Sequence, residues 1–394
     1  MTNVDPLRDV RVIDLTRILA GPYATMILGD LGADVVKVER PGHGDDTRHW
    51  GPPFVGDTAT YYLAVNRNKR SVTVDLKSAD GRAIVYRLLA EADVVVSNFS
   101  PGVMERLGLG QSQLADKFPG LIFCSITGHP PDDDRAHRPS FDLVIQAETG
   151  LMDLTGQPDG PPTKVGISIA DELAGLFLVQ GVLAALYHRE RTGEGRAVNV
   201  ALNEAVLAAF TYQGQQHLAG GAPPRRMGNE HPSLVPYRAY RAADADFVVG
   251  VANEGQWRRL CHAIGFDDLA EDGRFASNAR RVEHRLELEA MLDERFASRS
   301  RVDWIELLRD ADVPCGEVRA AGEALDREAE LDTGLVSELG EGLSSVGSPI
   351  WLGGKRLGAE RRPPALGEHT DEVLGEAGFS SAEIEQLRER GVVT

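Results

Sequence analysis

The sequence is poor in cysteine and in positive charge. Its three cysteines, Cys124, Cys261 and Cys315, lie far apart in 394 residues and form no CxxC pair. This spacing argues against a disulfide framework or a thiolate metal site and is typical of a reducing cytoplasm. Lys and Arg number 42 against 60 Asp and Glu, so the formal charge is −18. Such a field repels nucleic acid, and an anionic ligand must therefore meet a local basic pocket.

Signals for export and for membrane insertion are lacking as well. Residues 1–9 contain no basic stretch followed by an apolar core and a cleavage site. The longest mainly apolar segment, Leu173–Tyr187, has 15 residues and includes Gln180, whereas a membrane span needs about 20. We therefore expect a cytoplasmic protein with no membrane segment, in which this stretch forms a buried helix.

The common nucleotide and metal motifs do not occur. The first predicted strand is followed by Thr16–Pro22 in place of GxGxxG, which argues against a dinucleotide site. Ser348–Lys355 ends like a P-loop but lacks its first glycine and its final Ser or Thr. HExxH and GxSxG are absent, and the ten histidines show no metal-ligand spacing. We expect no metal and no permanently bound cofactor, which leaves carboxylate chemistry.

Strand-like and helical segments alternate through the first half of the chain. Several strand candidates are almost continuous apolar runs, as in parallel sheets covered on both faces. Helical patterns at Tyr23–Leu31 and Ala79–Glu91 occupy crossover positions, and a long helix begins near Asp171. These features predict an α/β fold with a large doubly wound, Rossmann-like domain that has no dinucleotide fingerprint. The strand candidates are Val10–Leu15, Val35–Glu39, Val72–Leu76, Val94–Ser97, Leu121–Ile126 and Ala197–Leu202.

A domain boundary is predicted at Gly220–Pro224, where paired glycines follow a helical pattern and paired prolines end it. Beyond it, Tyr237–Arg241 and Phe247–Ala252 alternate like a hairpin, and charged helical patterns follow. We therefore predict a large domain over residues 1–222, a small α+β domain over 223–322, and a C-terminal segment over 323–394 that packs back on the large domain.

A set of local strings occurs in one order along nearly the whole chain. They are Val12–Arg17, Ala20–Tyr23, Leu31–Pro41, Gly44–Arg48, Asn68–Ser71, Asp93–Gly102, Phe141–Ala147, Thr192–Gly195 and Leu366–Leu374. Together they resemble the class III coenzyme A transferases, the family of formyl-CoA and carnitine-CoA transferases. The resemblance implies an enzyme that moves CoA from an acyl-CoA to a small carboxylic acid, with CoA as substrate.

The resemblance also implies a nucleophile, Asp171, at the start of the long helix. A helix N-terminus supplies a positive partial charge that keeps a carboxylate ionised in a dry pocket. The alternative is that Asp171 simply caps the helix, which is a common use of aspartate. In the implied reaction Asp171 forms a mixed anhydride and then an aspartyl-CoA thioester, so that ATP is not required.

Further site residues follow from motif positions in that family. Gly228 and Asn229 are the candidates for an oxyanion loop, with a plain turn as the alternative. Arg40, Lys77 and Arg106 are expected at the phosphates or adenine of CoA, although solvated charges are the alternative for Lys77 and Arg106, and a core position for Phe99. The implied CoA-binding and acyl-site residues are Arg17, Leu19, Arg40, Val74, Lys77, Asn98, Phe99, Arg106 and Arg138.

One loop departs from the family pattern. Thr127–Arg135 contains an acidic run where many members have a GxGxxGP turn, so the acceptor acid is not predicted. The same fold hosts α-methylacyl-CoA racemases, which use a His and Asp pair. Phe141 stands where they have that histidine, which favours the transferase, although His129 and His137 lie nearby. A non-catalytic CoA-binding protein is a second alternative. Family members form interlocked homodimers, which we also expect here.

Overall fold

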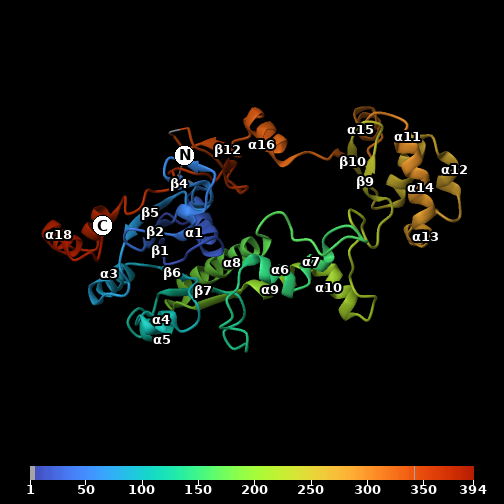
Figure 1. Cartoon of the computed structure of the whole chain (residues 1–394). Coiled ribbons are helices and arrows are strands. Elements are labelled where there is room, and N and C mark those ends of the chain that lie inside the picture. Colours follow the sequence, from blue (N-terminus) through green and yellow to red (C-terminus); the bar gives the residue numbers. More distant parts are fainter. Residues whose placement is uncertain (1–4, 341) are drawn as a thin grey trace. The chain divides into compact units, whose positions relative to one another are not determined.

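The computed structural model of the chain describes residues 5–340 and 342–394 (Figure 1). The chain divides into two compact units. The first comprises Met1–Leu151, Lys164–Ala222 and Glu328–Thr394, and the second comprises Met152–Thr163 and Pro223–Arg327. The short stretch 152–163 thus groups with the second unit, and the C-terminal residues group with the first.

The first unit contains a six-stranded parallel sheet with the order β5-β2-β1-β6-β7-β8. Counted within this sheet, the order is 3-2-1-4-5-6, which is that of doubly wound sheets that bind ligands at the carboxyl ends of their strands. The strands are β1 (Arg11–Asp14), β2 (Asp34–Glu39), β5 (Lys69–Thr73), β6 (Val94–Ser97), β7 (Ile122–Thr127) and β8 (Ala197–Ala201).

Five of the six strands lie where the sequence predicts them, and the bounds predicted for β5 are wrong. The apolar run suggested Val72–Leu76, whereas the strand is Lys69–Thr73. Hydrophobicity cannot reveal this strand because its first half is charged and nevertheless buried. Lys69 and Arg70 are paired with Asp14 and Asp34, which lie on the neighbouring part of the sheet.

Helices cover both faces of the sheet, and alternate residues of β1 enter different cores. Val12 packs in the core formed with α1 (Ala20–Asp30), α8 (Ile169–Thr192) and α9 (Leu202–Ala209). Ile13 packs in the core formed with α3 (Ala79–Ala90), α17 (Thr370–Glu376) and α18 (Ser381–Glu389). Figure 1 shows α3 and α18 on one side of the sheet and α8 and α9 on the other. The C-terminal helices therefore complete one layer of the first unit.

Helix α8 has 24 residues and is longer than the apolar run that predicts it. Within the described residues it is the single helix that is long and apolar enough to cross a membrane, judged by length and composition alone, with a mean hydropathy of 1.7 over 18 residues. Seven of its residues are buried, among them Ala174, Leu178 and Val182, which pack in the core of the first unit. Side chains on its other face are exposed.

The second unit is built on an antiparallel sheet of order β11-β10-β9. The predicted hairpin is present as β9 (Tyr237–Arg241) and β10 (Asp246–Gly250). One of the charged helical patterns that follow forms two helices, α13 (Asn278–Glu283) and α14 (Arg285–Phe296), with the break at His284. The unit's other elements are α11 (Glu254–Ile264), α12 (Asp267–Glu271), α15 (Arg301–Asp310), β11 (Cys315–Glu317) and most of α16 (Ala321–Glu330).

Shorter elements complete the chain. The helical segment after β8 is broken at Phe210 into α9 and α10 (Thr211–Leu218), because Thr211 has a φ of 39°. The remaining elements are η1 (Asp46–His49), β3 (Phe54–Val55), β4 (Thr58–Ala59), α2 (Thr60–Ala64), α4 (Val103–Arg106), α5 (Gln111–Ala115), α6 (Asp142–Glu148), α7 (Leu151–Leu154), β12 (Val336–Glu338), β13 (Ser344–Val346), β14 (Trp351–Leu352) and β15 (Lys355–Arg356).

A glycine in α8 permits the close contact between α8 and α1. A Cβ atom at Gly175 would lie 2.9 Å from the carbonyl oxygen of Ala20 and 3.0 Å from Cδ1 of Tyr23. Backbone on one side and a ring on the other leave no room for a methyl group. Gly175 therefore sets the distance between the first turns of the two helices, one of which carries Asp171.

We expect Gly175→Ala to lower the free energy of unfolding by about 1–3 kcal/mol, because overpacking forces the two helices apart. Chemical denaturation measures this loss. The matched control is Gly375→Ala in α17, where a Cβ atom meets nothing within 4 Å. That control should be neutral or slightly stabilising, since alanine is the better helix former. Equal effects of the two substitutions would contradict the close-contact role.

Candidate functional site

Two adjoining cavities lie at the carboxyl ends of the sheet strands. The Asp171 cavity has a volume of about 360 Å³ and the Arg40 cavity one of about 390 Å³. Loops after β1, β6 and β7 line the first, and loops after β1, β2 and β5 line the second. Arg17, Phe99 and Ser100 line both, so the two cavities meet at these residues. This is the edge at which doubly wound sheets bind their ligands.

Most of the residues predicted from the sequence line these cavities. Arg17, Leu19, Asn98, Phe99 and Arg138 line the Asp171 cavity. The Arg40 cavity is lined by Arg17, Arg40, Val74, Lys77 and Phe99.

Arg106 and Arg138 differ from this pattern. Arg106 ends α4, is exposed, and lines neither cavity. Arg138 lines the Asp171 cavity. It does not line the Arg40 cavity, where the phosphates of CoA are expected to bind near Arg40 and Lys77.

Asp171 is the third residue of α8, and its carboxylate is not used to cap the helix. The N-cap residue is Ser168, and the Ala170 N–H donates to Oδ1 of Asp142 on α6 at 2.8 Å. The alternative interpretation of Asp171 as the N-cap is therefore wrong. Among the described residues, the Asp171 carboxylate has no hydrogen-bond or ion-pair partner, and it faces the cavity.

Burial and two neighbouring carboxylates determine the protonation of Asp171. Burial, followed by the charges of the nearby Asp142 and Glu172 carboxylates, raises the pKa of Asp171 from 3.8 to about 7. From the sequence, we expected the helix N-terminus to keep this group ionised. The raised pKa contradicts that expectation, because desolvation and like-charge repulsion outweigh the helix dipole.

This pKa predicts how stability changes with pH. The folded-state pKa of Asp171, about 7, lies above the ordinary aspartate pKa of 3.8. Ionising Asp171 therefore destabilises the fold progressively as the pH rises from about 4 to 7. Asp171→Asn removes that charge. It should raise the melting temperature by a few degrees at pH 8 and leave it nearly unchanged at pH 4.

Thermal melts at the two pH values test this, with Asp57→Asn as the control because Asp57 is an exposed aspartate of the same unit. The control should change neither melting temperature. A stabilisation by Asp171→Asn that is equal at pH 4 and pH 8 would contradict the raised pKa.

Aromatic and aliphatic side chains that the sequence analysis missed surround Asp171. Trp50, Phe141 and Ile18 line its cavity. Tyr61 packs edge-on against Trp50 with 5.5 Å between ring centroids. Burial, followed by the Asp171 charge, raises the pKa of the Tyr61 phenol. No period or motif marks these residues, since they come from separate loops that meet only in the fold.

The histidines considered for a racemase lie outside the site. His129 is buried with Nε2 3.4 Å from Glu148, and His137 is exposed. Within the described residues, no histidine lines either cavity. The acidic run of the same loop is also turned away, because Asp133 pairs with Arg135 and the run lines neither cavity. In the described part of the chain, no group of three His, Cys, Asp or Glu could hold a metal ion.

The Arg40 cavity combines cations with an aromatic ring. Arg40 follows β2 and Lys77 follows β5, and both side chains are exposed. The Arg17 guanidinium lies 5.6 Å from the centroid of the Phe99 ring. Glu39 and Asp45 also line this cavity, but they are neutralised by Arg48 and Lys37. Exposed cations beside an aromatic surface can bind phosphates and a base.

Gly228 and Asn229 form a turn in the second unit. Gly228 has a φ of 59°, and its N–H donates to the Gly156 carbonyl at 3.0 Å. This N–H is therefore already paired within the second unit. The oxyanion role of the turn stays a prediction.

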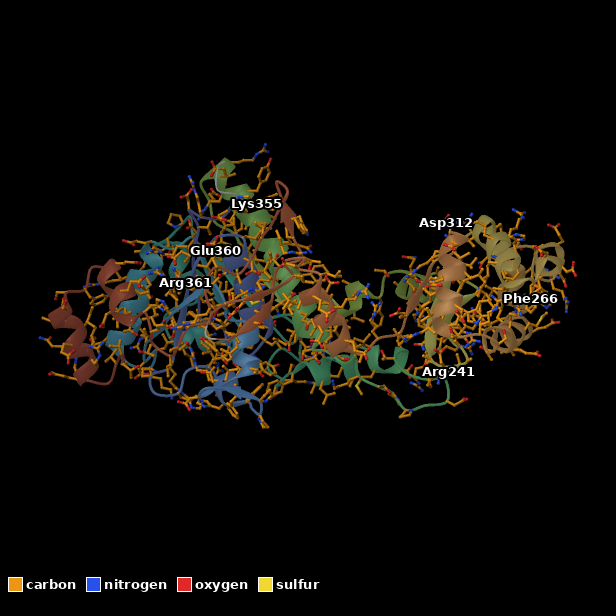
Figure 2. The ribbon with its side chains drawn as sticks, turned by 90° about the horizontal axis from the view of Figure 1, so that it is seen from above. Arg241, Phe266, Asp312, Lys355, Glu360 and Arg361 are labelled. Atoms are coloured by element: carbon orange, nitrogen blue, oxygen red, sulfur yellow. The ribbon has the colours of Figure 1, made fainter. Side chains whose placement is uncertain are left out.

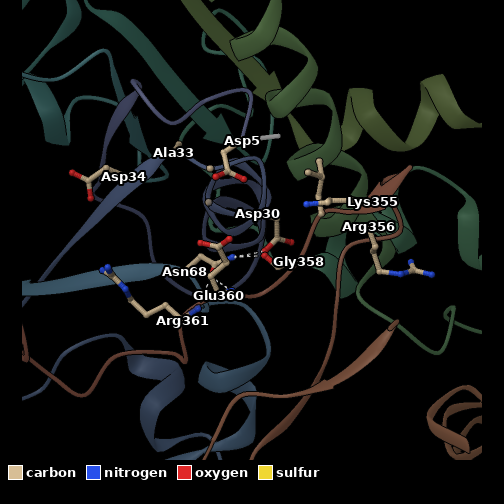
Figure 3. A pocket seen from close by; sticks show the side chains of 13 residues that line it. Asp5, Asp30, Ala33, Asp34, Asn68, Lys355, Arg356, Gly358, Glu360 and Arg361 are labelled. Atoms are coloured by element: carbon tan, nitrogen blue, oxygen red, sulfur yellow. Dashed lines mark hydrogen bonds between the residues drawn. The ribbon is translucent and has the colours of Figure 1, made fainter. Parts of the chain in front are cut away.

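A third cavity, of about 360 Å³, lies near the start of β2 and holds none of the predicted site residues (Figure 3). Asn68 accepts hydrogen bonds from the N–H groups of Glu360 and Arg361 and donates to Asp30 and Gly358. These bonds attach the C-terminal segment to the sheet. Figure 2 shows the same segment at Lys355, Glu360 and Arg361, while its labels Arg241, Phe266 and Asp312 mark the second unit.

Comparison with known proteins assigns the family. Residues 7–370 match CoA-transferase family III. The chain is 39% identical over 396 residues to succinyl-CoA:glutarate CoA-transferase of Mus musculus, covering 99% of this chain and 91% of that one. It is 40% identical over 381 residues to succinate–glutarate CoA-transferase of Agrobacterium fabrum, covering 94% and 95%.

A solved structure agrees with these sequence matches. The crystal structure of a CAIB/BAIF family protein from Brucella suis has a TM-score of 0.83 to this chain at 39% identity, covering 94% of this chain and 99% of that chain. Fold, sequence and family profile therefore coincide over nearly the whole length. The chain belongs to CoA-transferase family III and is an enzyme of that family.

Proposed function

We propose that this enzyme transfers CoA from a donor such as succinyl-CoA to a small dicarboxylic acid such as glutarate, with Asp171 as the nucleophile. The observation that carries the proposal is a half-buried, unpaired carboxylate in a cavity that adjoins a second cavity lined by Arg40 and Lys77. The names of the mouse and Agrobacterium relatives support the acid class. Arg138 offers a cation for a second carboxylate on the side of Asp171.

The reaction proceeds in four displacements at carbonyl carbons. A carboxylate oxygen of Asp171 attacks the thioester carbonyl, and the C–S bond breaks to give a mixed anhydride and CoA thiolate. The thiolate attacks the Asp171 carbonyl and releases the donor acid, which leaves an aspartyl-CoA thioester. The acceptor carboxylate attacks that thioester and expels the thiolate, which then attacks the acceptor carbonyl. The new acyl-CoA departs and the Asp171 carboxylate is restored, so no ATP is consumed.

The Arg40 cavity supplies CoA binding in this proposal. Arg40 and Lys77 neutralise phosphate charge, and Val74 and Phe99 provide apolar surface for the nucleotide. Because Arg17 and Phe99 border both cavities, a ligand held at Arg40 can extend its thioester toward Asp171. In this proposal the Arg40 cavity binds CoA, the Asp171 cavity holds the reacting thioester, and Arg17, Phe99 and Ser100 border both.

Asp171→Ala should abolish turnover while the Kd of free CoA stays unchanged, because the substitution removes the attacking oxygen and leaves the Arg40 cavity intact. Lys77→Ala should instead raise KM for the acyl-CoA several-fold with little loss of kcat, since it weakens binding of substrate and transition state alike. Steady-state kinetics and calorimetry measure both. Turnover that survives Asp171→Ala would contradict the nucleophile and favour a binding protein or another mechanism.

The assay itself separates the transferase from the racemase. The enzyme is incubated in deuterated water with succinyl-CoA, acetyl-CoA or 2-methylacyl-CoA and a panel of carboxylates, and all CoA esters are weighed by mass spectrometry. New acyl-CoA masses that match the added acids are expected. A one-deuteron gain on the 2-methylacyl ester without acid exchange would identify a racemase in place of the transferase.

We also propose that the enzyme is an interlocked homodimer. Large apolar side chains are exposed on three neighbouring helices of the first unit, which is unusual for a monomer surface. They are Leu176, Phe177, Leu183 and Tyr187 on α8, Leu207 on α9 and Leu218 on α10. Light scattering should give twice the chain mass of 42.7 kDa, whereas a mass of one chain at micromolar concentration would contradict the dimer.

A further inference from the structure

Ile18 has a backbone conformation that its side chain disfavours. Its φ is 71°, in the left-handed region, where a β-branched residue is a steric outlier. Ile18 lines the Asp171 cavity, directly between Arg17 and Leu19. Strain of this kind persists only where surrounding groups hold the backbone, and it is concentrated at functional sites.

Each residue before this strained position is held by side chains from other elements. The Thr16 N–H and hydroxyl donate to Oδ1 of Asp14, and its carbonyl accepts from Nζ of Lys37 at 2.9 Å. Asn98 accepts from the Arg17 N–H at 2.9 Å and donates to the Arg17 carbonyl at 2.6 Å.

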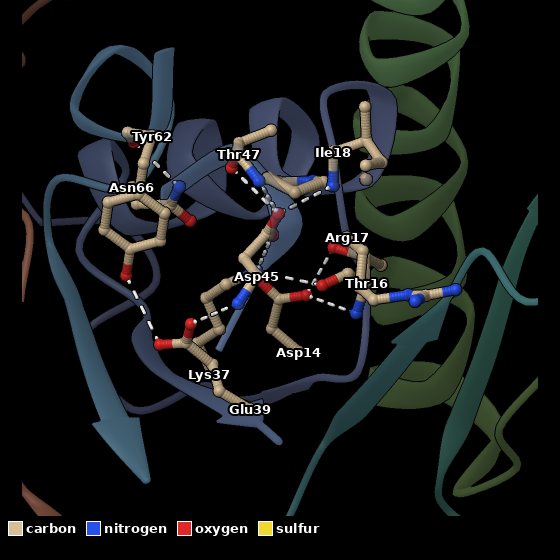
Figure 4. A network of polar contacts seen from close by, with 12 residues as sticks. Asp14, Thr16, Arg17, Ile18, Lys37, Glu39, Asp45, Thr47, Tyr62 and Asn66 are labelled. Carbon is tan, nitrogen blue, oxygen red and sulfur yellow. Dashed lines mark hydrogen bonds and ion pairs between the residues drawn. The ribbon is translucent and has the colours of Figure 1, made fainter. Parts of the chain in front are cut away.

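The Ile18 N–H donates to Oδ1 of Asp45 at 3.3 Å. The loop 16–18 is therefore held by Asp14 and Lys37, by Asn98 and by Asp45. Figure 4 shows Asp14, Lys37 and Asp45 beside the loop.

Apart from Asn98, the groups that hold the loop belong to two buried ion pairs. Lys37 pairs with Asp45 at 3.0 Å, and Lys69 pairs with Asp14 at 3.1 Å. All four side chains are at most 1% exposed. Apolar side chains of similar volume would often give equal or better stability than buried ion pairs. Stability alone therefore does not account for these four residues. Asp14, Lys37 and Asp45 hydrogen-bond to the loop, and Lys69 is the buried partner of Asp14.

We propose that Asp45 and Lys37 are positioning residues, which hold the loop 16–18 in its strained conformation so that Ile18 and Leu19 present a fixed wall to the reacting thioester beside Asp171. The kinetic part of this inference rests on the proposed function, and the conformational part does not. Without the Asp45 carboxylate, Ile18 relaxes to a negative φ and its side chain leaves the cavity wall.

Two substitutions at Ile18 test the strain directly. Ile18→Ala and Ile18→Gly both truncate the side chain, but only glycine adopts a φ of 71° without cost. Alanine is ordinarily the more stabilising of the two residues. Here the glycine variant should melt a few degrees higher than the alanine variant. The opposite order, or equal melting temperatures, would overturn the inference.

The role of Asp45 is tested by rescue. Asp45→Ala is made in the wild-type, Ile18→Ala and Ile18→Gly backgrounds. In the first two, kcat should fall on the order of tenfold or more, because small displacements at a reacting centre are costly. In the glycine background the loss of kcat should be largely absent, since glycine adopts the loop conformation without strain. The melting temperature should fall in all three backgrounds, because Lys37 loses its buried partner in each.

Equal losses of kcat in all three backgrounds would show that Asp45 is merely structural and would overturn the proposal. If Asp45→Ala does not fold, Asp45→Asn is used in the same backgrounds, because it keeps an acceptor oxygen and removes only the charge opposite Lys37. Asp30→Asn, in the buried pair with Arg67 at the other end of the sheet, is the control and should show no rescue by glycine. If the wild-type enzyme transferred no CoA, the proposed function would fail, while the melting temperatures of the same variants still decide the loop inference.

Discussion

The paired charges beneath the carboxyl edge of the sheet constrain the whole site. Lys69 of β5 reaches Asp14 of β1 and also donates to the Pro22 carbonyl at 2.8 Å, at the start of α1. One buried lysine thus connects β5 to the end of β1 and to the first turn of α1. Because Gly175 brings α8 against that same turn of α1, the position of Asp171 depends on this charge network through the contact of the two helices.

Hydrophobic periodicity was sufficient to predict the layers of the fold. It could not predict the network of buried charges beneath the carboxyl edge of the sheet. Val94–Ser97 was predicted to the residue because a strand buried on both faces is a continuous apolar run. β5 was misplaced because Lys69, Arg70 and Ser71 are buried by pairing, and pairing partners 30 to 55 residues away leave no local signal. The breaks at Thr211 and His284 were likewise not predicted, since threonine and histidine are both tolerated within helices.

The candidate site divides in the same way. Residues that carry their chemistry in their type and whose positions the family resemblance implies, such as Asp171, Lys77 and Phe99, were found from the sequence and lie at the cavities. Residues that act through conformation or through a neighbour, such as Ile18 and Asp142, were not found. An isoleucine gives no indication of a positive φ, and the Asp142 carboxylate acquires its role only when α6 meets the start of α8.

The environment of Asp171 disfavours the charged form of its side chain and favours a neutral form. Its carboxylate is desolvated and is repelled by Asp142 and Glu172, and no cation among the described residues lowers its pKa. In the proposed reaction, acylation converts that carboxylate into a neutral anhydride or thioester. The repulsion and desolvation that raise its pKa are then released, since both act on the charged form alone. The same physical terms that weaken Asp171 as an acid therefore stabilise its covalent intermediates relative to the free carboxylate, and a basic carboxylate is also the better nucleophile.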